Sequence, residues 1–403
     1  MISNLVLFQI KGYEYIMRIY ADNAATTKVD KRVLDKMLPY FCDLYGNPSS
    51  VHSAGQEVKA AIDEAREKVA NAIGCESKEI YFTAGGSEAD NWAIKGIAKK
   101  YASKGKHIIS TKIEHHAVLH TLDALKKEGY EITLLDVDSE GFIDLEELEK
   151  AIRPDTILIT IMFANNETGV MEPVAEIGRI AKEHKVLFHT DAVQAVGHVP
   201  VNVKEMNIDL LSMSAHKFNA PKGVGALYVR KGIIMPNLID GGGQEKGRRA
   251  GTENTAAIVG MGEAIKIAVE NMEEESKKVT YLRDKLLNGL MEKIPECKQN
   301  TPKSDKRLPG IANLSLKYIE GESILLMMDI KGICASSGSA CTSGSLDPSH
   351  VLLALGLDHG TAHGSVRFSL DRFNTEEEVD YILEELPKIA ERLRAMSPLW
   401  NNR

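Results

Sequence analysis

Short apolar runs alternate with longer amphipathic stretches along the first two thirds of the chain. The apolar runs have the length of buried β-strands and cover residues 79–83, 107–111, 131–136, 156–163, 186–190 and 208–213. Helical patterns follow most of them, at 87–99, from 115, at 145–152 and at 173–184. This order predicts an α/β fold, with a large domain built on a mostly parallel sheet that helices cover on both faces.

Two more helices are predicted near the start of the chain, at 31–41 and 53–73. The pattern changes in the last third of the chain, which a very long predicted helix, from 255 to 293, leads into. After Pro309 come a strand at 311–316, a helix at 321–331, a strand-like piece around Cys334, a helix at 350–355 and a strand at 365–370. The last helix opens at Thr375 with a capping-box sequence. This is the pattern of a second, smaller α+β domain.

We therefore divide the chain into three parts. Residues 1–17 are expected to form a disordered N-terminal extension, residues 18–265 the large domain and residues 266–403 the small C-terminal domain. The first residues of the large domain could instead pack with the small one. Residues 1–16 contain neither a basic start nor a small-residue cleavage site, so we predict no signal peptide.

Composition narrows the function classes. Of the 403 residues, 43% are hydrophobic and 26% charged, as in ordinary globular proteins. The net charge of −8 argues against nucleic acid or an anionic membrane as partner, and no apolar run approaches the length of a bilayer span. The five cysteines are odd in number and widely spread, which favours free thiols in a reducing compartment. We expect a cytoplasmic protein.

Polar residues gather where the predicted strands end. They are Gly86, Ser87, His115, Asn165, Asn166, Asp191, Gln194, Ser214, His216 and Lys217. In sheets of this type, ligands bind at the carboxyl ends of the strands, so we expect these residues to share one cleft.

Lys217 carries the most specific chemistry in this set. It follows a buried strand and precedes a turn marked by Pro221 and Gly223. Burial disfavours a charged ammonium and leaves a nucleophilic amine, which a Schiff-base lysine needs. The alternative is an ordinary lysine in a surface loop. Gly86 and Ser87 open a helix whose N–H groups suit a phosphate, with Ser87 as the cap; a plain strand-to-helix turn is equally compatible.

Taken together, these side chains match the needs of pyridoxal phosphate. This cofactor requires a lysine, a carboxylate for its ring nitrogen, an aromatic face and phosphate donors. Lys217, Asp191 and His115 supply the first three. Singly, His115 could be a core histidine and Asp191 a helix cap. A competing reading is a zinc site on His116 and His120, but the sequence offers no evident third ligand and we predict no metal.

Two features belong to the second domain. Ser, Thr and Gly surround Cys341 almost entirely, which predicts an exposed, mobile segment with a reactive thiol. Cys334 lies in a strand-like stretch and is expected to be inert, although a Cys334–Cys341 redox pair is the alternative. Arg367 interrupts an apolar strand and is suited to grip a carboxylate, or else to form a structural salt bridge. The glycine-rich segment 241–251, before Thr252, lies in the predicted large domain and suits either an anion-binding loop or a flexible connection.

These motifs resemble the cysteine desulfurases of the iron–sulfur-cluster and nitrogen-fixation type, which are fold-type-I pyridoxal-phosphate enzymes of the class-V aminotransferase family. The likeness runs from about residue 18 to the C-terminal region. The matching stretches are 20–27, 46–48, 114–115, 165–169, 189–194, 214–217, 249–252, 336–341 and 367–369.

The resemblance implies a role for each matching residue. Cofactor contacts are Gly86, Ser87, His115, Asn166, Asp191, Gln194, Ser214, His216, Lys217 and Thr252. Lys217 would hold the cofactor as a Schiff base and His115 would stack on its ring. Asp191 and Gln194 would meet the ring nitrogen and the phenolic oxygen. Thr252 would reach in from the partner subunit of a homodimer. Ser87 stands where the family often has threonine, and the hydroxyl is kept.

The implied activity is removal of sulfur from L-cysteine, giving L-alanine and a persulfide on Cys341. Arg367 and Asn166 would bind the substrate, and Lys217, His115 and Cys341 would be catalytic. The sulfur would pass to an iron–sulfur scaffold or another acceptor, with tRNA thiolation as a second destination. The alternatives are an aminotransferase, a selenocysteine lyase, and a catalytically silent partner-binding relative. An aminotransferase would not need Cys341.

Overall fold

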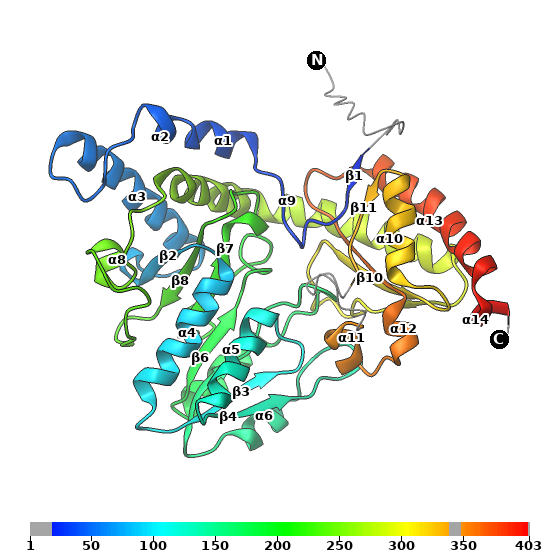
Figure 1. Ribbon diagram of the computed structural model, residues 1–403, viewed down its shortest axis with the longest axis horizontal. Helices are drawn as coiled ribbons and strands as arrows, with labels where there is room; N and C mark the ends of the chain where they lie inside the picture. Colours follow the sequence, from blue (N-terminus) through cyan, green and yellow to red (C-terminus); the bar gives the residue numbers. More distant parts are fainter. Residues whose placement is uncertain (1–17, 338–347, 402–403) are drawn as a thin grey trace.

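The computed structural model describes residues 18–337 and 348–401, and within these ranges a seven-stranded sheet forms the centre of the protein (Figure 1). Its strands are β2 (Ile80–Thr83), β3 (His107–Thr111), β4 (Glu131–Leu135), β5 (Thr156–Thr160), β6 (Leu187–Asp191), β7 (Leu210–Ser214) and β8 (Gly225–Val229). The spatial order is β2-β8-β7-β6-β5-β3-β4. The neighbours from β7 to β4 run parallel, whereas β8 is antiparallel to both β7 and β2. The predicted α/β class is confirmed.

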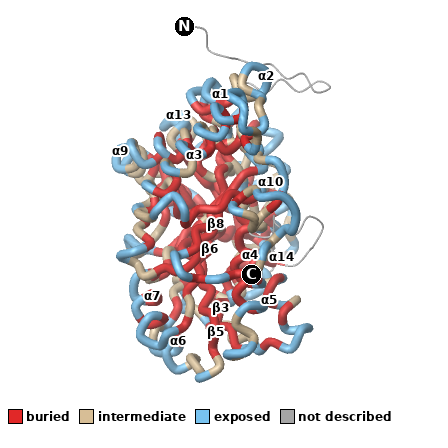
Figure 2. The backbone as a smooth tube through the Cα atoms, turned by 90° about the vertical axis from the view of Figure 1, so that its left-hand side faces the viewer, coloured by how far each residue is buried: buried red, intermediate tan, exposed pale blue. Residues whose placement is uncertain are grey.

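Helices cover both faces of this sheet because both faces carry apolar side chains. One core joins the sheet to α4 (Gly86–Tyr101) and α5 (His116–Lys127). The other core joins it to α3 (Ser53–Ala72), α6 (Leu145–Ala151), α7 (Val174–Glu183) and the first part of α9 (Thr255–Lys293). Figure 2 shows the strands as a buried layer inside these helices.

A separate apolar core lies on smaller sheets. The strand order β12-β10-β9 joins Ser365–Ser369, Ile311–Leu316 and Cys297–Gln299 in antiparallel pairs. A parallel pair joins β1 (Ile19–Tyr20) to β11 (Ile333–Cys334). Helices α10 (Gly321–Ile330) and α13 (Glu376–Met396) pack on this core, and α13 opens with the predicted capping box at Thr375.

Helix α9 connects the large sheet to the smaller sheets. Its buried apolar residues up to Ala268 belong to the core that includes α3, and those from Val279 to Leu290 belong to the core of the smaller sheets. Gly262 allows α9 to cross α3 closely, because a Cβ there would lie 2.7 Å from the Cα of Ala65. The predicted division between residues 265 and 266 falls inside this helix, and the domain boundaries remain a prediction.

Several local expectations were wrong. The helix expected at 31–41 is two helices, α1 (Lys31–Met37) and α2 (Pro39–Cys42), because Pro39 has no N–H to continue the first. The helix after β2 starts at Gly86 with Gly85 as the capping residue, so Ser87 lies inside it and is not its cap. Strands β8 and β9 were not expected.

The remaining elements are short. They are η1 (Ser77–Glu79), η2 (Ala215–Lys217), α8 (Gln244–Gly247), α11 (His350–Ala354), α12 (His359–His363) and α14 (Pro398–Asn401). A small apolar cluster seats Val351 and Leu352 of α11 against Ile113 and Met162 of the large sheet's loops. Among the described helices, none is long and apolar enough to cross a membrane.

Candidate active site

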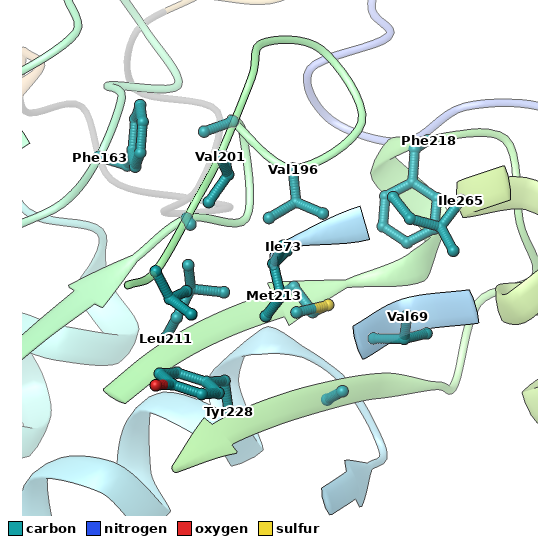
Figure 3. Packing of buried hydrophobic residues seen from close by; sticks show 14 of the residues in the cluster. Val69, Ile73, Phe163, Val196, Val201, Leu211, Met213, Phe218, Tyr228 and Ile265 are labelled. Carbon is teal, nitrogen blue, oxygen red and sulfur yellow. The ribbon is translucent and has the colours of Figure 1, made fainter. Parts of the chain in front are cut away.

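Lys217 is held in place by apolar neighbours on both sides. It ends the 3₁₀ turn η2 that directly follows β7, and Ala215 and Phe218 beside it are at most 1% exposed. Phe218 packs in the same core as Ile265 of α9, and Figure 3 shows these two side chains together. The imidazole of His198 also contacts the Lys217 carbonyl oxygen at 2.9 Å. Because Ala215 and Phe218 are buried, the turn is fixed and the Lys217 amine lies at the carboxyl edge of the sheet.

The side chains of Lys217 and Gln194 converge on one carbonyl oxygen. Lys217 Nζ donates to the oxygen of Ala24 at 2.5 Å and to that of Ala25 at 3.0 Å. Gln194 Nε2 donates to the same Ala24 oxygen at 3.0 Å. Two predicted site residues from separate strand ends therefore meet.

Asp191 and His115 form the electrostatic centre of the site. Asp191 ends β6, and its Oδ1 accepts from the N–H of Val193 at 2.9 Å. Burial raises the Asp191 pKa to about 6, and the nearby charge of Lys217 opposes that rise. Burial, and then the charge of Lys217, lower the His115 pKa to about 4. At neutral pH the site thus presents an anionic carboxylate and an uncharged imidazole.

A second buried layer backs Asp191. The ring of His189 contacts Thr160 Oγ1 at 2.8 Å and Ser212 Oγ at 3.0 Å, and its Nε2 lies 3.7 Å from Asp90 Oδ1. Burial lowers the His189 pKa to about 3, so this histidine is neutral. Sequence reasoning did not single out Asp90, which faces inward from α4. Only its spacing along that helix could have indicated it.

The first turn of α4 faces Ser214 at the end of β7. A Cβ built on Gly85 would lie 3.7 Å from Ser214 Oγ, and one on Gly86 would lie 3.5 Å from Ser214 Cβ. A Cβ on Gly225 of β8 would lie 2.8 Å from Gly85 Cα, so close packing requires glycine there. The capping residue Gly85 has no side chain to cap this helix, and among the described residues this leaves its N-terminal N–H groups and the Ser214 hydroxyl as neighbouring donors for an anion.

Residues 22–27 lie over the lysine turn, and this was missed from the sequence. His216 Nδ1 contacts Thr26 Oγ1 at 3.1 Å, and Thr27 Oγ1 donates to the His216 oxygen at 2.9 Å. Burial, together with nearby lysines, lowers the His216 pKa to about 4. The available signal was a run of small and polar residues just after a short strand.

Arg367 reaches the site from β12. Its Nη1 donates to the Asn166 carbonyl at 2.9 Å, and its Nη2 pairs with Asp22 Oδ1 at 2.8 Å. The Arg367 side chain is 4% exposed, and its buried Nε has no partner among the described residues. The structural salt bridge considered above is therefore present, and the guanidinium keeps further N–H groups, Nε–H among them, that no described contact occupies.

Two predicted site residues are not placed in this group. Thr252 is exposed, and no described contact joins it to the strand-end residues. Cys341 lies outside the described residues. The possible zinc ligands His116 and His120 stack with ring centroids 5.0 Å apart, and the His350 ring lies 4.7 Å from that of His116. Within the described ranges, no group of three or more potential ligands is arranged to hold a metal ion.

Comparison with known families agrees with this geometry. The model of the family "Aminotransferase class-V" matches residues 19–382. This chain belongs to the class-V aminotransferase family. A protein named cysteine desulfurase IscS from Clostridium botulinum (strain Hall) is 58% identical over 386 residues, covering 96% of this chain and 97% of that protein.

The chain also resembles solved structures with the same fold. A NifS-like protein superposes with a TM-score of 0.89 and 42% identity, covering 94% of this chain and all of the other. A structure described as SspA in complex with cysteine superposes with a TM-score of 0.78 and 39% identity, covering 89% of this chain and all of the other. The resemblance drawn from the motifs is thereby confirmed.

Class-V aminotransferases depend on pyridoxal phosphate, and this chain has the donors that the cofactor needs. The uncapped start of α4 and Ser214 suit its phosphate. Asp191 suits its ring nitrogen, and Lys217 suits its aldehyde carbon. The residues present therefore fit the group.

Proposed function

We propose that this chain releases sulfur from L-cysteine, giving L-alanine and a persulfide on Cys341 that supplies sulfur for iron–sulfur cluster assembly, with tRNA thiolation as a second destination. The observation that carries this proposal is the meeting of Lys217 and Gln194 on one carbonyl oxygen, beside Asp191. The curated relatives named cysteine desulfurase support the substrate.

Each site residue of this chain would have its own role in the reaction. Pyridoxal phosphate, when bound, supplies a ring that accepts electrons from the substrate Cα. The Asp191 carboxylate would keep the ring nitrogen protonated, and the uncharged His115 ring would stack against the cofactor. Lys217 Nζ would carry a proton to and from the substrate Cα. Arg367 would bind the substrate carboxylate through guanidinium N–H groups that no described contact occupies, Nε–H among them.

The residues flanking the Cys341 segment support its role as sulfur acceptor. On one side, the Ser336 backbone pairs with that of Arg367 through N–H to oxygen contacts of 3.1 and 2.6 Å. On the other side, His350 Nε2 contacts the Glu114 carbonyl at 3.0 Å, next to His115. One end of the segment is thus joined to Arg367, and the other to the residue before His115. The Cys341 thiolate would attack the substrate sulfur and form an S–S bond while the substrate C–S bond breaks. The electron pair of the broken bond would stay with the substrate carbon, which takes up a proton to give L-alanine, and Cys341 would hold the sulfur as a persulfide.

We also propose a homodimer in which Thr252 completes the cofactor site of the partner subunit. Large apolar side chains are exposed along α1, α2 and the loop after them: Leu34, Leu38, Phe41, Tyr45 and Val51, the last being 94% exposed. Such a gathering indicates a surface that another chain covers, and a second copy of this chain is the partner that the Thr252 assignment requires. A monomer at micromolar concentration with full cofactor occupancy would contradict this assignment.

A cytoplasmic location is proposed from the thiols. The described cysteines Cys42, Cys75, Cys297 and Cys334 are all free. Free thiols persist in reducing compartments.

The activity is tested by incubating the holoenzyme with L-cysteine and dithiothreitol and measuring alanine and sulfide. Equal amounts of the two are expected. A keto acid formed in place of alanine would indicate an aminotransferase, and no turnover would indicate a silent relative. Parallel rates with L-selenocysteine measure how far the site accepts the selenium substrate.

A further inference from the structure

The glycine-rich segment that precedes Thr252 forms a closed loop, which we call the 239–251 loop. Its two ends pair with each other: the Leu238 N–H donates to the Arg248 carbonyl at 2.8 Å, and the Ala250 N–H to the Ile239 carbonyl at 3.1 Å. Thr252 follows the second end almost directly. The position of Thr252 therefore depends on how this loop is attached to the rest of the subunit.

The first attachment is a buried carboxylate. Glu245 is 6% exposed, and its two oxygens accept from the Arg66 guanidinium of α3 at 2.7 and 2.8 Å. One of them also accepts the N–H of Phe82 at 2.9 Å. Strand β2 is at the edge of the seven-stranded sheet, so within the described ranges this N–H has no neighbouring strand to pair with on that side.

The backbone of the loop is held in an uncommon conformation at the same place. Glu245 and Lys246 have φ values of 46° and 59°, which side-chain-bearing residues keep only where the surroundings hold them. The Lys246 ammonium also lies 4.7 Å from the centre of the Tyr81 ring, again on β2. The loop is thus fixed to the strand that leads into the turn at Gly85 and Gly86.

The second attachment is an ion pair with the other side of that turn. Arg249 Nε donates to Glu88 Oε1 at 2.9 Å, and its Nη2 donates to Glu88 Oε2 at 3.2 Å. Both side chains are about one quarter exposed, at 23% and 22%. Glu88 lies in the first turn of α4, just after Gly86 and Ser87. The 239–251 loop is therefore attached both to β2, which precedes the turn that suits the cofactor phosphate, and to α4, which follows it.

We propose that Glu245 and Arg249, through Arg66, Phe82 and Glu88, are positioning residues that hold Thr252 where the partner subunit's cofactor phosphate can accept from it. This inference rests on the proposed dimer and on its pyridoxal-phosphate site. Charge alone does not explain the arrangement. Glu88 and Glu245 place negative charges near a phosphate-binding turn, and that would weaken the binding of an anion.

An electrostatic effect and a positioning effect predict opposite changes in affinity for pyridoxal phosphate. Glu88→Gln and Glu245→Gln each remove one negative charge, so electrostatics alone predicts tighter binding of pyridoxal phosphate. If the variants instead displace Thr252, pyridoxal phosphate should bind more weakly, by about tenfold if one charge-assisted hydrogen bond to the phosphate is lost. Apoenzyme is titrated with pyridoxal phosphate and, separately, with pyridoxal, which has no phosphate, and binding is followed by cofactor absorbance.

We expect both variants to bind pyridoxal phosphate about tenfold more weakly and pyridoxal within twofold of the wild type. The matched control is Glu183→Gln, which breaks the exposed Arg179 ion pair of α7 and should change neither affinity. In a Thr252→Ala background, Glu88→Gln should cause no additional loss, because both changes act on the same contact.

Unchanged or tighter binding of pyridoxal phosphate in Glu88→Gln would overturn the proposal. An equal loss of pyridoxal binding, or a loss additive to that of Thr252→Ala, would do so as well. If Glu245→Gln does not fold, the partly exposed Glu88→Gln decides the question. A different result would overturn the proposed dimer itself: the wild type would sediment as a monomer, and Thr252→Ala would have no effect on the affinity for pyridoxal phosphate.

Discussion

Replacing Asp191 with asparagine should stabilise the cofactor-free protein and weaken cofactor binding. In the folded apoprotein, burial raises the pKa of this carboxyl from 3.8 to about 6. The folded state therefore binds the proton more tightly than the unfolded state, and stability falls as pH rises through this range. Ionisation of the buried Asp191 carboxyl therefore lowers the unfolding free energy of the apoprotein. This destabilisation is fully present above pH 6, where it amounts to about 3 kcal/mol, and at pH 5 it is about half as large.

Asparagine at position 191 keeps the shape of the side chain and removes its negative charge. Asp191→Asn should therefore raise the unfolding free energy of the apoprotein by up to about 3 kcal/mol at pH 8 and by about half of that at pH 5. It should also lower the affinity for pyridoxal phosphate by about 10- to 100-fold, the value of a hydrogen bond to a charged group. Urea unfolding of the apoprotein at the two pH values and cofactor titration at pH 8 measure both effects.

Asp209→Asn is the matched control, because Asp209 is a buried carboxylate next to the same sheet that already has partners. It accepts from Arg230 Nε at 2.5 Å and from the Phe188 N–H at 2.9 Å. Its loss should destabilise the apoprotein and leave cofactor affinity nearly unchanged. A gain in Asp191→Asn that is equal at pH 5 and pH 8, or no gain, would refute the assignment of a desolvated carboxylate at the site.

Three further predictions follow from the site. Lys217→Ala should abolish covalent attachment of the cofactor; borohydride reduction and peptide mapping of the wild type should find the pyridoxyl label on Lys217, and a label on Lys222 would contradict this. Arg367→Lys should raise KM for L-cysteine by about tenfold or more, because a two-pronged grip is lost, and kinetics with cysteamine, which has no carboxylate, should show no such change. Cys341→Ser should still bind the cofactor but release essentially no sulfide, whereas Cys334→Ser should behave nearly as the wild type; desulfurase activity surviving in Cys341→Ser would show that the wrong thiol was chosen.

The strand-end residues could be predicted because the large sheet is mostly parallel. Once the alternation of strands and helices was recognised, Asp191, Gln194 and Lys217 had to lie at one edge. The sequence also contained enough periodicity to predict the long helix α9 correctly.

Other parts of the site depend on tertiary contacts that no local pattern contains. Ala24 accepts bonds from Lys217 and Gln194 through its backbone oxygen, which any residue type could supply. Arg367 meets Asp22 from the far end of the chain, so neither residue indicates the other. The strand β8 runs antiparallel in a mostly parallel sheet, and a short apolar run does not reveal its direction.

The central claim is that Cys341 accepts the sulfur of L-cysteine. The most direct measurement incubates the holoenzyme with L-cysteine in the absence of other thiols and maps the added sulfur by mass spectrometry, with alanine measured in the same sample. We predict that sulfur is gained at Cys341 in step with the alanine formed, in amounts up to one per subunit. Alanine formed without sulfur on Cys341, or a persulfide on Cys334, would contradict the account.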